Sequence, residues 1–499
     1  MHIVLVIPPG KSFLSTNWMA SPPMGMSYCA AVLEKDRHKV TIVDAFAEGL
    51  EYDGLAQKVA RLHPDAVGIY FMTDNRFRGF RAIREIKKAL PQIKIMAGGP
   101  HPTLAADDTL RNIPQLDYIV RGEGEAVVPK LVKYIEKGAL PEGLEGVSYR
   151  KNSQVYHNPD GELIKDLDSI PFPATHLLSL DKYNYHVVVP GKGRVKALFV
   201  LNSRGCPFKC IFCSNTLLWG NKYRSRSPEN FVDEIEFDIN TYGVRGFTFS
   251  DDTFNNNREN VFRICDLILQ RGLALDWTCQ VRVDQMDRQM AMKMKEAGCF
   301  ALQFGVESGK QRIIDEVINK HITLQQVENV LAYCREAGLW SFPNFMFGFP
   351  TETYEDTLVT LNYIKKIHRE GVFPVLNLIK IYPGTRIEEI ARKEGVIPRD
   401  FSWADEHFTV RVKDALPSVL GFAPLYRDKL SWVQIGEILF QWGDSRKDII
   451  HVWQIAFNAL KGIRRIRDIT RLFCLSIAFI KVKAGEMAHA GRGKGIEPV

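Results

Sequence analysis

The chain has 499 residues, more than one hydrophobic core usually organises, so its length predicts two or three domains. Its hydrophobic fraction of 45% and charged fraction of 25% are those of a globular protein, which excludes a disordered or collagen-like chain. The 65 Lys and Arg against 58 Asp and Glu give a net charge of +7, too small an excess to indicate nucleic-acid binding, and we expect no nucleic-acid partner.

The chain opens MHIVLVIPPG, without the basic start, apolar run and cleavage site of a signal peptide. Nine cysteines, an odd number, favour a reducing compartment. The longest apolar run, Leu472 to Ile480, is much shorter than the roughly 18 residues that span a bilayer. These features predict a cytoplasmic protein, either soluble or peripheral to the inner membrane.

Residues 1–140 alternate strand-like and helix-like segments. Short apolar runs predict strands at Ile3–Ile7, Lys39–Asp44, Ala66–Tyr70, Lys94–Gly98 and Tyr118–Arg121. Helical spacing predicts helices at Ser27–Lys35, Gly54–Leu62, Phe77–Leu90 and Ala126–Lys137. This order predicts an α/β, doubly wound, Rossmann-like domain with a parallel sheet.

Residues 141–190 are expected to form a linker. It contains a hairpin through Gly146 to Asn158, and then Pro171 and Pro173, which interrupt regular ladder bonding. A second βα series follows over residues 191–400 and predicts a full or partial (β/α) barrel with its chemistry at the carboxyl ends of the strands. Its strands are expected at Val195–Leu201, Gly246–Ser250, Asp276–Val283, Ala301–Val306, Ser341–Phe347 and Val375–Ile381.

Residues 401–499 are expected to form a helical C-terminal region. Basic residues from Lys461 to Arg471 alternate with apolar ones such as Ile466 and Leu472, a pattern that suits the surface of an anionic membrane. The alternative is a helix that packs on the barrel with its basic face in water, and the pattern favours this reading.

A cysteine motif follows the first strand of the second series. Cys206, Cys210 and Cys213 have the spacing C-x3-C-x2-C on a loop over the barrel mouth. Three thiolates hold three irons of a cubane cluster and leave the fourth iron open to an exchangeable ligand. A structural zinc site would need a fourth Cys or His, which the loop lacks. The other cysteines are expected to be small buried apolar residues: Cys29, Cys265, Cys279, Cys299, Cys334 and Cys474.

This loop resembles the signature of the radical S-adenosylmethionine (SAM) superfamily, over about residues 190 to 390. The resemblance implies a 4Fe-4S cluster whose open iron chelates SAM, so that one-electron reduction releases methionine and a 5′-deoxyadenosyl radical. It also implies SAM contacts on the strand-end loops, and several of these positions have alternative readings as helix caps, solvent-facing residues or simple turns. The expected SAM-binding residues are Phe212, Asp251, Asp252, Gln280, Arg282, Glu307, Ser308 and Tyr382.

Two loops of the first domain lie where a doubly wound sheet binds ligands. Gly98-Gly99-Pro100-His101-Pro102-Thr103 follows the fourth strand, and Arg121-Gly122-Glu123-Gly124-Glu125 follows the fifth. Their glycines would also suit a nucleotide site or a purely structural loop, but no G-x-G-x-x-G follows Ile7.

Joined to a radical SAM barrel, this domain resembles the cobalamin-binding domain of class B radical SAM methylases and of the oxygen-independent Mg-protoporphyrin ester cyclase group, over roughly residues 1 to 140. D-x-H-x-x-G, another common cobalamin motif, is absent, so we do not expect His101 to ligate cobalt. The expected cofactor-binding residues are Thr73, Gly98, Gly99, His101, Thr103, Arg121, Gly122 and Glu123.

The sequence therefore predicts a cobalamin-dependent radical SAM enzyme that functionalises an unactivated carbon of a small molecule, by methyl transfer rather than by cyclisation or oxidation. A non-methylating cyclase acting on a tetrapyrrole or lipid is the first alternative, and an iron-sulfur electron-transfer or redox-sensing protein is the second. The expected partners are the substrate, possible contact of the C-terminal helix with a membrane, and an electron donor such as flavodoxin or ferredoxin. Neither the substrate nor the group that acts on it follows from the sequence.

Overall fold

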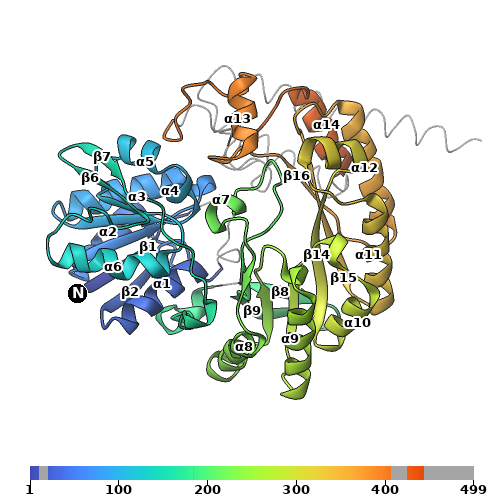
Figure 1. Cartoon of the computed structure of the whole chain (residues 1–499), viewed down its shortest axis with the longest axis horizontal. Coiled ribbons are helices and arrows are strands. Elements are labelled where there is room, and N and C mark those ends of the chain that lie inside the picture. Colours follow the sequence, from blue (N-terminus) through green and yellow to red (C-terminus); the bar gives the residue numbers. More distant parts are fainter. Residues whose placement is uncertain (11–20, 184, 406–423, 443–499) are drawn as a thin grey trace, which may run out of the picture.

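The protein, as a computed structural model, is described for residues 1–10, 21–183, 185–405 and 424–442. Two seven-stranded sheets lie side by side, the first in the blue half of Figure 1 and the second in the green and yellow half. The expected helix from residue 461 to 473 lies outside the described residues. Among the helices that the structure does describe, none is both long and apolar enough to cross a bilayer.

The first sheet has the strand order β2-β1-β3-β4-β5-β6-β7, and its first five members pair in parallel. These strands are β1 (His2–Ile7), β2 (Lys39–Asp44), β3 (Ala66–Tyr70), β4 (Lys94–Gly98) and β5 (Tyr118–Val120). The doubly wound fold and its five parallel strands are confirmed.

Helices cover both faces of this sheet because its strands are apolar on both sides. Along β1, Ile3 and Leu5 pack into one core cluster, and Val4 and Val6 into another on the opposite face. The first cluster includes residues of α1 (Met24–Lys35) and α6 (Gly124–Glu136), and the second residues of α2 (Tyr52–Arg61) and α3 (Arg76–Ala89). Two short helices, α4 (Pro100–Leu104) and α5 (Ala106–Asn112), follow β4.

The predicted hairpin within residues 146–158 is confirmed, but it belongs to the first sheet and not to a linker. Its strands β6 (Val147–Lys151) and β7 (Gln154–His157) are antiparallel, and β6 pairs with β5. Because β6 pairs with β5, the first sheet continues beyond residue 140, the predicted end of the domain. The local pattern revealed the hairpin but carried no information on its pairing partner.

The second sheet has the order β16-β15-β14-β13-β12-β9-β8. Its parallel strands are β9 (Gly193–Val200), β12 (Gly246–Phe249), β13 (Asp276–Gln280), β14 (Cys299–Glu307), β15 (Trp340–Phe347) and β16 (Val375–Leu378). The short strand β8 (His186–Val189), in the expected linker, adds an antiparallel edge beside β9. The strands β8 and β16 are not paired with each other, so the barrel is partial and open.

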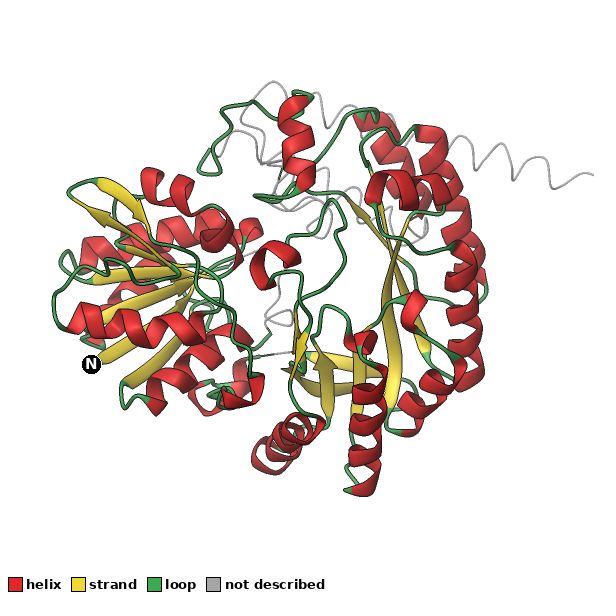
Figure 2. Ribbon diagram, viewed as in Figure 1, coloured by secondary structure: helices red, strands yellow, loops and turns green. Residues whose placement is uncertain are grey.

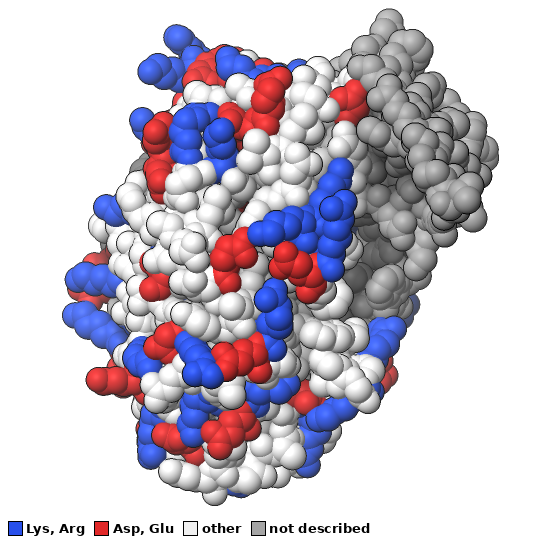
Figure 3. All heavy atoms as spheres, turned by 90° about the vertical axis from the view of Figure 1, so that its right-hand side faces the viewer, with Lys and Arg blue, Asp and Glu red and all other residues white. Residues whose placement is uncertain are grey.

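Five helices cover the outer, convex face of this sheet (Figure 2). They are α8 (Pro228–Tyr242), α9 (Arg258–Gln270), α10 (Arg288–Glu296), α11 (Leu324–Ala337) and α12 (Tyr354–Arg369). The helix α14 (Trp432–Trp442) packs on α12. On the face seen in Figure 3, positive and negative side chains are interspersed. Ion pairs also join α11 to α12 and its C-terminal end, as in Lys366–Glu328 and Arg335–Glu370.

Candidate active site

The cysteine loop begins where β9 ends. Gly205 has φ +89°, in the left-handed region, and a Cβ there would collide with the carbonyl oxygen of Lys222. Only glycine fits this turn without strain. The loop is held from two sides, because the Ile211 amide donates to the Ile318 carbonyl (3.1 Å) and the Ile387 amide donates to the Ile211 carbonyl (3.1 Å).

The thiols of Cys206, Cys210 and Cys213 are free and partly exposed. Burial raises the pKa of Cys210 and raises that of Cys213 to about 12, so iron binding would displace protons from these sulfurs. Among the described residues, no three Cys, His, Asp or Glu side chains already converge as a closed metal-ligand set. Residues 205–213 supply three thiols and no other side chain of those types, which is the donor chemistry of a cluster with one open iron.

Two acids follow β12, and their environments differ. Asp251 is 1% exposed and already accepts hydrogen bonds from the Ser203 hydroxyl and the Asn202 amide. Asp252 accepts from Asn215 Nδ2 at 2.5 Å, while its buried Oδ2 has no partner among the described residues. Burial raises the pKa of each carboxyl to about 6. The structure thus leaves Asp252 as the acid with a free oxygen at the barrel mouth.

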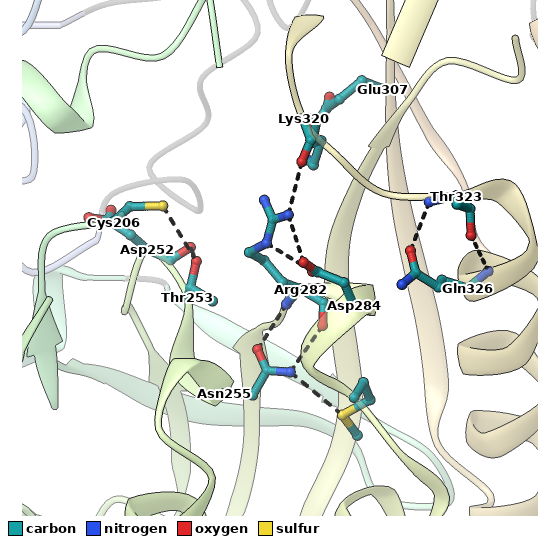
Figure 4. Close-up of polar contacts among 11 residues, drawn as sticks. Cys206, Asp252, Thr253, Asn255, Arg282, Asp284, Glu307, Lys320, Thr323 and Gln326 are labelled. Atoms are coloured by element: carbon teal, nitrogen blue, oxygen red, sulfur yellow. Dashed lines mark hydrogen bonds and ion pairs between the residues drawn. The ribbon is translucent and has the colours of Figure 1, made fainter. Parts of the chain in front are cut away.

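Arg282 lies across the mouth from the cysteine loop (Figure 4). Its guanidinium lies 3.3 Å from the ring centroid of Phe208, between the first two cysteines, and it donates to Asp284 at 2.9 Å. Asn255 fixes the backbone at this point, because its side chain bonds both the Arg282 amide (2.9 Å) and the Arg282 carbonyl (3.0 Å). A cation–π contact of this kind orients the loop as well as the guanidinium.

Glu307, at the end of β14, forms a buried ion pair with Lys320. Lys320 Nζ lies 2.5 Å from Glu307 Oε1, and its backbone carbonyl accepts from Arg282. Gly305 makes room for this pair, because a Cβ there would overlap both charged groups. Lys320 was missed by sequence reasoning, since its loop carries no recognisable motif.

The other expected SAM contacts are spread around the mouth. Phe212 packs beside Phe349, with ring centroids 6.1 Å apart, and Gln280 is exposed at the end of β13. The hydroxyl of Tyr382 donates to Asp74 of the first domain at 3.0 Å. Ser308 is fully buried and bonds Thr360 at 3.1 Å, so its hydroxyl serves the packing of α12.

A cavity of about 260 Å³ lies between the two sheets. It sits at the carboxyl ends of β1, β3 and β4, where the strand order 2-1-3 reverses direction and open α/β sheets bind ligands. Four of the expected cofactor-binding residues line it, and so does the free acid Asp252. The four are Gly98, Gly99, Thr103 and Gly122.

Gly99 shows why this wall is built from glycine. Its φ is +99°, and a Cβ would lie 2.7 Å from the ring of Tyr70 and 2.9 Å from the carbonyl oxygen of Phe71. The bare backbone of Gly98 and Gly99 lets a large, flat ligand approach closely. These features fit a bulky cofactor seated between the domains.

The remaining expected cofactor residues lie elsewhere. His101 is fully buried near Phe80 and Trp403, and its Nδ1 lies 3.2 Å from the hydroxyl of Thr73. Neither residue is on the cavity wall. Burial holds the pKa of His101 well below its ordinary value. A histidine in a glycine-rich loop looked available in the sequence, but α4 turns it into the core.

The last two, Arg121 and Glu123, hold other segments in place. Arg121 bonds Asp160 and the Asn158 carbonyl, while Glu123 is central to a buried interdomain charge cluster. Within this cluster, Arg204 lies 2.9 Å from Glu123 and 2.6 Å from Glu125, and Arg224 lies 2.9 Å from Glu123. Two guanidinium groups of the barrel thus meet two carboxylates of the first domain beside the cavity.

The fold and the site together define a class of enzyme. Its iron-sulfur loop lies at the mouth of a partial barrel, and its second domain presents a glycine-lined cavity to that mouth. Two family models match the chain, the "Radical SAM superfamily" over residues 201–391 and the "B12 binding domain" over residues 19–132. The chain belongs to the cobalamin-dependent radical SAM family. Its cofactors are a 4Fe-4S cluster, SAM and cobalamin.

Relatives of known sequence support this assignment. An uncharacterized methyltransferase of Pyrococcus horikoshii is 35% identical, over 78% of this chain and 83% of the relative. An anaerobic magnesium-protoporphyrin IX monomethyl ester cyclase of Rubrivivax gelatinosus is 31% identical, over 71% of this chain and 64% of the cyclase. The match thus spans less than two thirds of that cyclase.

Among solved structures, the radical SAM methyltransferase TsrM of Kitasatospora setae has a TM-score of 0.71 at 16% identity, and the match covers 97% of this chain and 99% of TsrM. The cobalamin-dependent enzyme OxsB has a TM-score of 0.68 at 17% identity over 95% of this chain and 70% of OxsB. These likenesses confirm the fold across both domains.

Proposed function

We propose that the protein transfers a methyl group to an unactivated carbon of a small molecule bound in the open barrel. The observation that carries this proposal is the cavity between the domains, whose walls include Gly99 of the first domain and Asp252 of the barrel mouth. A methyl carrier seated there would face the same space as SAM. When bound, the cluster with SAM supplies a 5′-deoxyadenosyl radical, and cobalamin supplies the methyl carrier.

The chain's own residues orient these groups and keep water out. We assign the cluster to Cys206, Cys210 and Cys213. The unpartnered oxygen of Asp252 suits an ammonium group such as that of methionine, while the Glu307–Lys320 pair offers an acceptor and a donor to a ribose or carboxylate.

Three further expected SAM contacts also belong to the proposed site. Arg282 supplies positive charge at the mouth, and Phe212 and Tyr382 supply walls on the side of α13 (Arg386–Lys393). The cobalamin side of the cavity is assigned to Gly98, Gly99, Thr103 and Gly122.

The partner assignments also belong to the proposal. A flavodoxin or ferredoxin would deliver the electron, and a tetrapyrrole or a lipid-like molecule would bind in the open barrel, beside the apolar cofactor cavity that Leu5, Met24 and Trp219 help to line. Peripheral membrane contact would use the basic segment from Lys461 to Arg471, which lies outside the described residues.

The test is anaerobic reconstitution with iron, sulfide and hydroxocobalamin, followed by incubation with methyl-deuterated SAM, a reductant and a small-molecule extract. Methyl transfer predicts S-adenosylhomocysteine and 5′-deoxyadenosine in equal amounts, with a product that has gained the deuterated methyl group. Cys206→Ala should abolish 5′-deoxyadenosine, while Cys334→Ala, at a buried core thiol, should not. An iron signal unchanged by SAM, with no 5′-deoxyadenosine, would instead support the electron-transfer alternative.

A second candidate function is cyclisation without methyl transfer, which the similarity to the Rubrivivax gelatinosus cyclase favours. It uses the same cavity and the same cysteine loop. It predicts 5′-deoxyadenosine and a substrate that has lost hydrogen, without S-adenosylhomocysteine. The ratio of the two SAM products therefore separates the two functions.

A further inference from the structure

The inner, concave face of the partial barrel is accessible, and its side chains are distinctive. Along β15 every inward residue is partly exposed and every outward residue is buried, from Trp340 (partly exposed) and Ser341 (buried) to Met346 and Phe347. The outward residues Phe345 and Phe347 pack against the covering helices. The inward residues Trp340, Phe342, Asn344 and Met346 therefore line the inside of the half-barrel, where each is partly exposed.

Amide side chains occupy this face on four neighbouring strands. Gln280 of β13 is in register with Gln303 of β14. Asn344 of β15 is level with Gly305, two residues above Gln303, and Asn377 of β16 is level with Met346. These positions form an ascending row of amides across the sheet, here called the amide row: Gln280, Gln303, Asn344 and Asn377.

The amide row has hydrogen-bonding capacity to spare. Gln280, Gln303 and Asn377 make no side-chain hydrogen bond to any described residue, and Asn344 makes one long bond, 3.4 Å, to the Phe342 carbonyl. All four are accessible rather than buried. Each amide offers two N–H donors and an oxygen acceptor, so the row can pair with both donors and acceptors on one ligand.

An aromatic floor lies at the foot of the amide row, where Phe342 is level with Gln303 and Trp340 lies two residues nearer the amino ends of the strands. Phe373 packs against Trp340 and Phe342 with ring centroids 5.2 and 5.4 Å apart. On the opposite side, Tyr185 stacks on Phe199 at 4.3 Å. From Phe342 to Met346 is four residues, or roughly 13 Å of strand at 3.3 Å per residue, which is enough depth for a flat ring system.

Charge on this face lies at its foot and at its upper end, where the Glu307–Lys320 pair packs over Gly305, level with Asn344. Asp276, at the foot of β13, is held by Lys192 at 2.7 Å, and Glu307, at the mouth, is paired with Lys320. Between them, the inward positions described on β12 to β16 carry no ionisable carboxylate, ammonium or guanidinium. A charged group placed against this wall would lose hydration without gaining a counter-charge, which is costly.

We infer that the amide row and the aromatic floor form the substrate site. The site selects an uncharged, flat ring whose edge carries both an N–H donor and an oxygen or nitrogen acceptor. A lactam, a pyrrole or an amide-bearing heterocycle has this chemistry. The ring of the substrate stacks against the aromatic floor, and the amide side chains form hydrogen bonds with its edge. A carbon of the ring or of its substituent then points toward the mouth of the barrel. This inference rests on the proposed function for the location of the chemistry. Gln280, an expected SAM contact, stands at the boundary between the two sites.

The test uses three probes of one shape and different charge, namely benzamide, benzoate and benzylammonium, with binding to the reconstituted holoenzyme measured by saturation-transfer NMR. Benzamide should bind at least about tenfold more tightly than either ion, since each lost or unpaired hydrogen bond of this kind costs close to tenfold in affinity. Asn344→Leu should weaken benzamide by about tenfold. Gln325→Leu, at an exposed amide on α11, is the matched control and should have no effect.

A variant that introduces a negative charge distinguishes loss of the site from simple misfolding. Gln303→Glu keeps the shape of the side chain and should turn the preference toward benzylammonium, which a damaged fold would not do. Iron content close to that of the natural chain would show that the variant is folded.

Equal binding of the three probes, no detectable benzamide binding, or an unchanged preference in Gln303→Glu would overturn the inference. The binding measurement needs no turnover. A benzamide preference without any methylated product would refute only the proposed methyl transfer, and methyl transfer without the preference would refute only the substrate class.

Discussion

The interdomain charge cluster gives a quantitative test of how the two domains are held together. Glu123 and Arg204 are 1% and 4% exposed at their side chains, and Glu125 and Arg224 are 7% and 11% exposed. Burial lowers the pKa of Arg204, but the two carboxylates more than offset this and hold it above its ordinary value. Two carboxylates thus face two guanidinium groups, so the formal charges of the cluster balance.

Glu123→Gln would leave two buried guanidinium groups beside one carboxylate. Removal of one member of a buried ion pair typically costs about 3–5 kcal/mol, because the partner remains buried and uncompensated. For a unit of 150–250 residues, each kcal/mol lowers Tm by about 2–4 °C, so we expect a decrease of roughly 6 °C or more. The assay is scanning calorimetry of the natural chain, Glu123→Gln, Arg224→Met and the double variant.

The double variant is the decisive arm. It leaves Arg204 opposite Glu125, one positive charge against one negative, so it should be more stable than Glu123→Gln alone. If the two single losses instead add in the double variant, then charge balance is not what holds the domains together. A decrease below about 1 kcal/mol in Glu123→Gln would show that the cluster is as weak as an exposed ion pair.

Three further predictions concern the site and its supports. Cys210→Ala should lose the iron-sulfur absorbance and all 5′-deoxyadenosine formation, because only two thiolates remain. Gly99→Ala should release cobalamin on gel filtration with little loss of iron, because its Cβ would lie 2.7 Å from the ring of Tyr70. Burial raises the pKa of Glu352 from 4.5 to about 7, so the folded chain keeps a proton that the unfolded chain releases, and stability falls as pH rises through that interval. Glu352→Gln keeps the oxygen that accepts from the amides of residues 348 and 349, and should match the natural chain near pH 4 and exceed it near pH 8 by up to about 3 kcal/mol in thermal unfolding.

Matched variants control these three tests. Cys334→Ala changes a buried core thiol and should keep the cluster. Gly138→Ala adds a Cβ at a positive φ, +62°, where nothing lies within 4 Å, and should keep cobalamin. Glu355→Gln, in the first turn of α12, should show no comparable pH dependence. Cobalamin retained by Gly99→Ala, or a stability difference for Glu352→Gln that does not change with pH, would contradict the reasoning.

Much of the fold followed from the sequence because its signals are local. Short apolar runs identified the eleven parallel strands of the described residues, and helical spacing identified α1, α2, α3 and α6 of the first domain but not the short helices α4 and α5. The cysteine spacing also acts within nine residues, so Cys206, Cys210 and Cys213 were recognisable as one donor set. The edge strand β8 and the short segments β10 (Ser203–Arg204), β11 (Arg224–Ser225) and α7 (Asn215–Trp219) were missed, since two to five residues are too few to show a period.

The tertiary structure decided which polar residues remain available, because that depends on neighbours far away in the chain. Asp251 and Asp252 are adjacent carboxylates, yet their hydrogen bonding differs. Asp251 accepts a hydrogen bond from Ser203, whereas Oδ2 of Asp252 has no partner among the described residues. Trp403, about 300 residues further along the chain, encloses His101 in the core. The sequence by itself determined the three-thiol donor set and the succession of parallel strands along the chain. The arrangement of the two sheets decided which side chains face the cavity. A buried polar group forms hydrogen bonds with the groups that the fold places beside it, and these are often distant in the sequence.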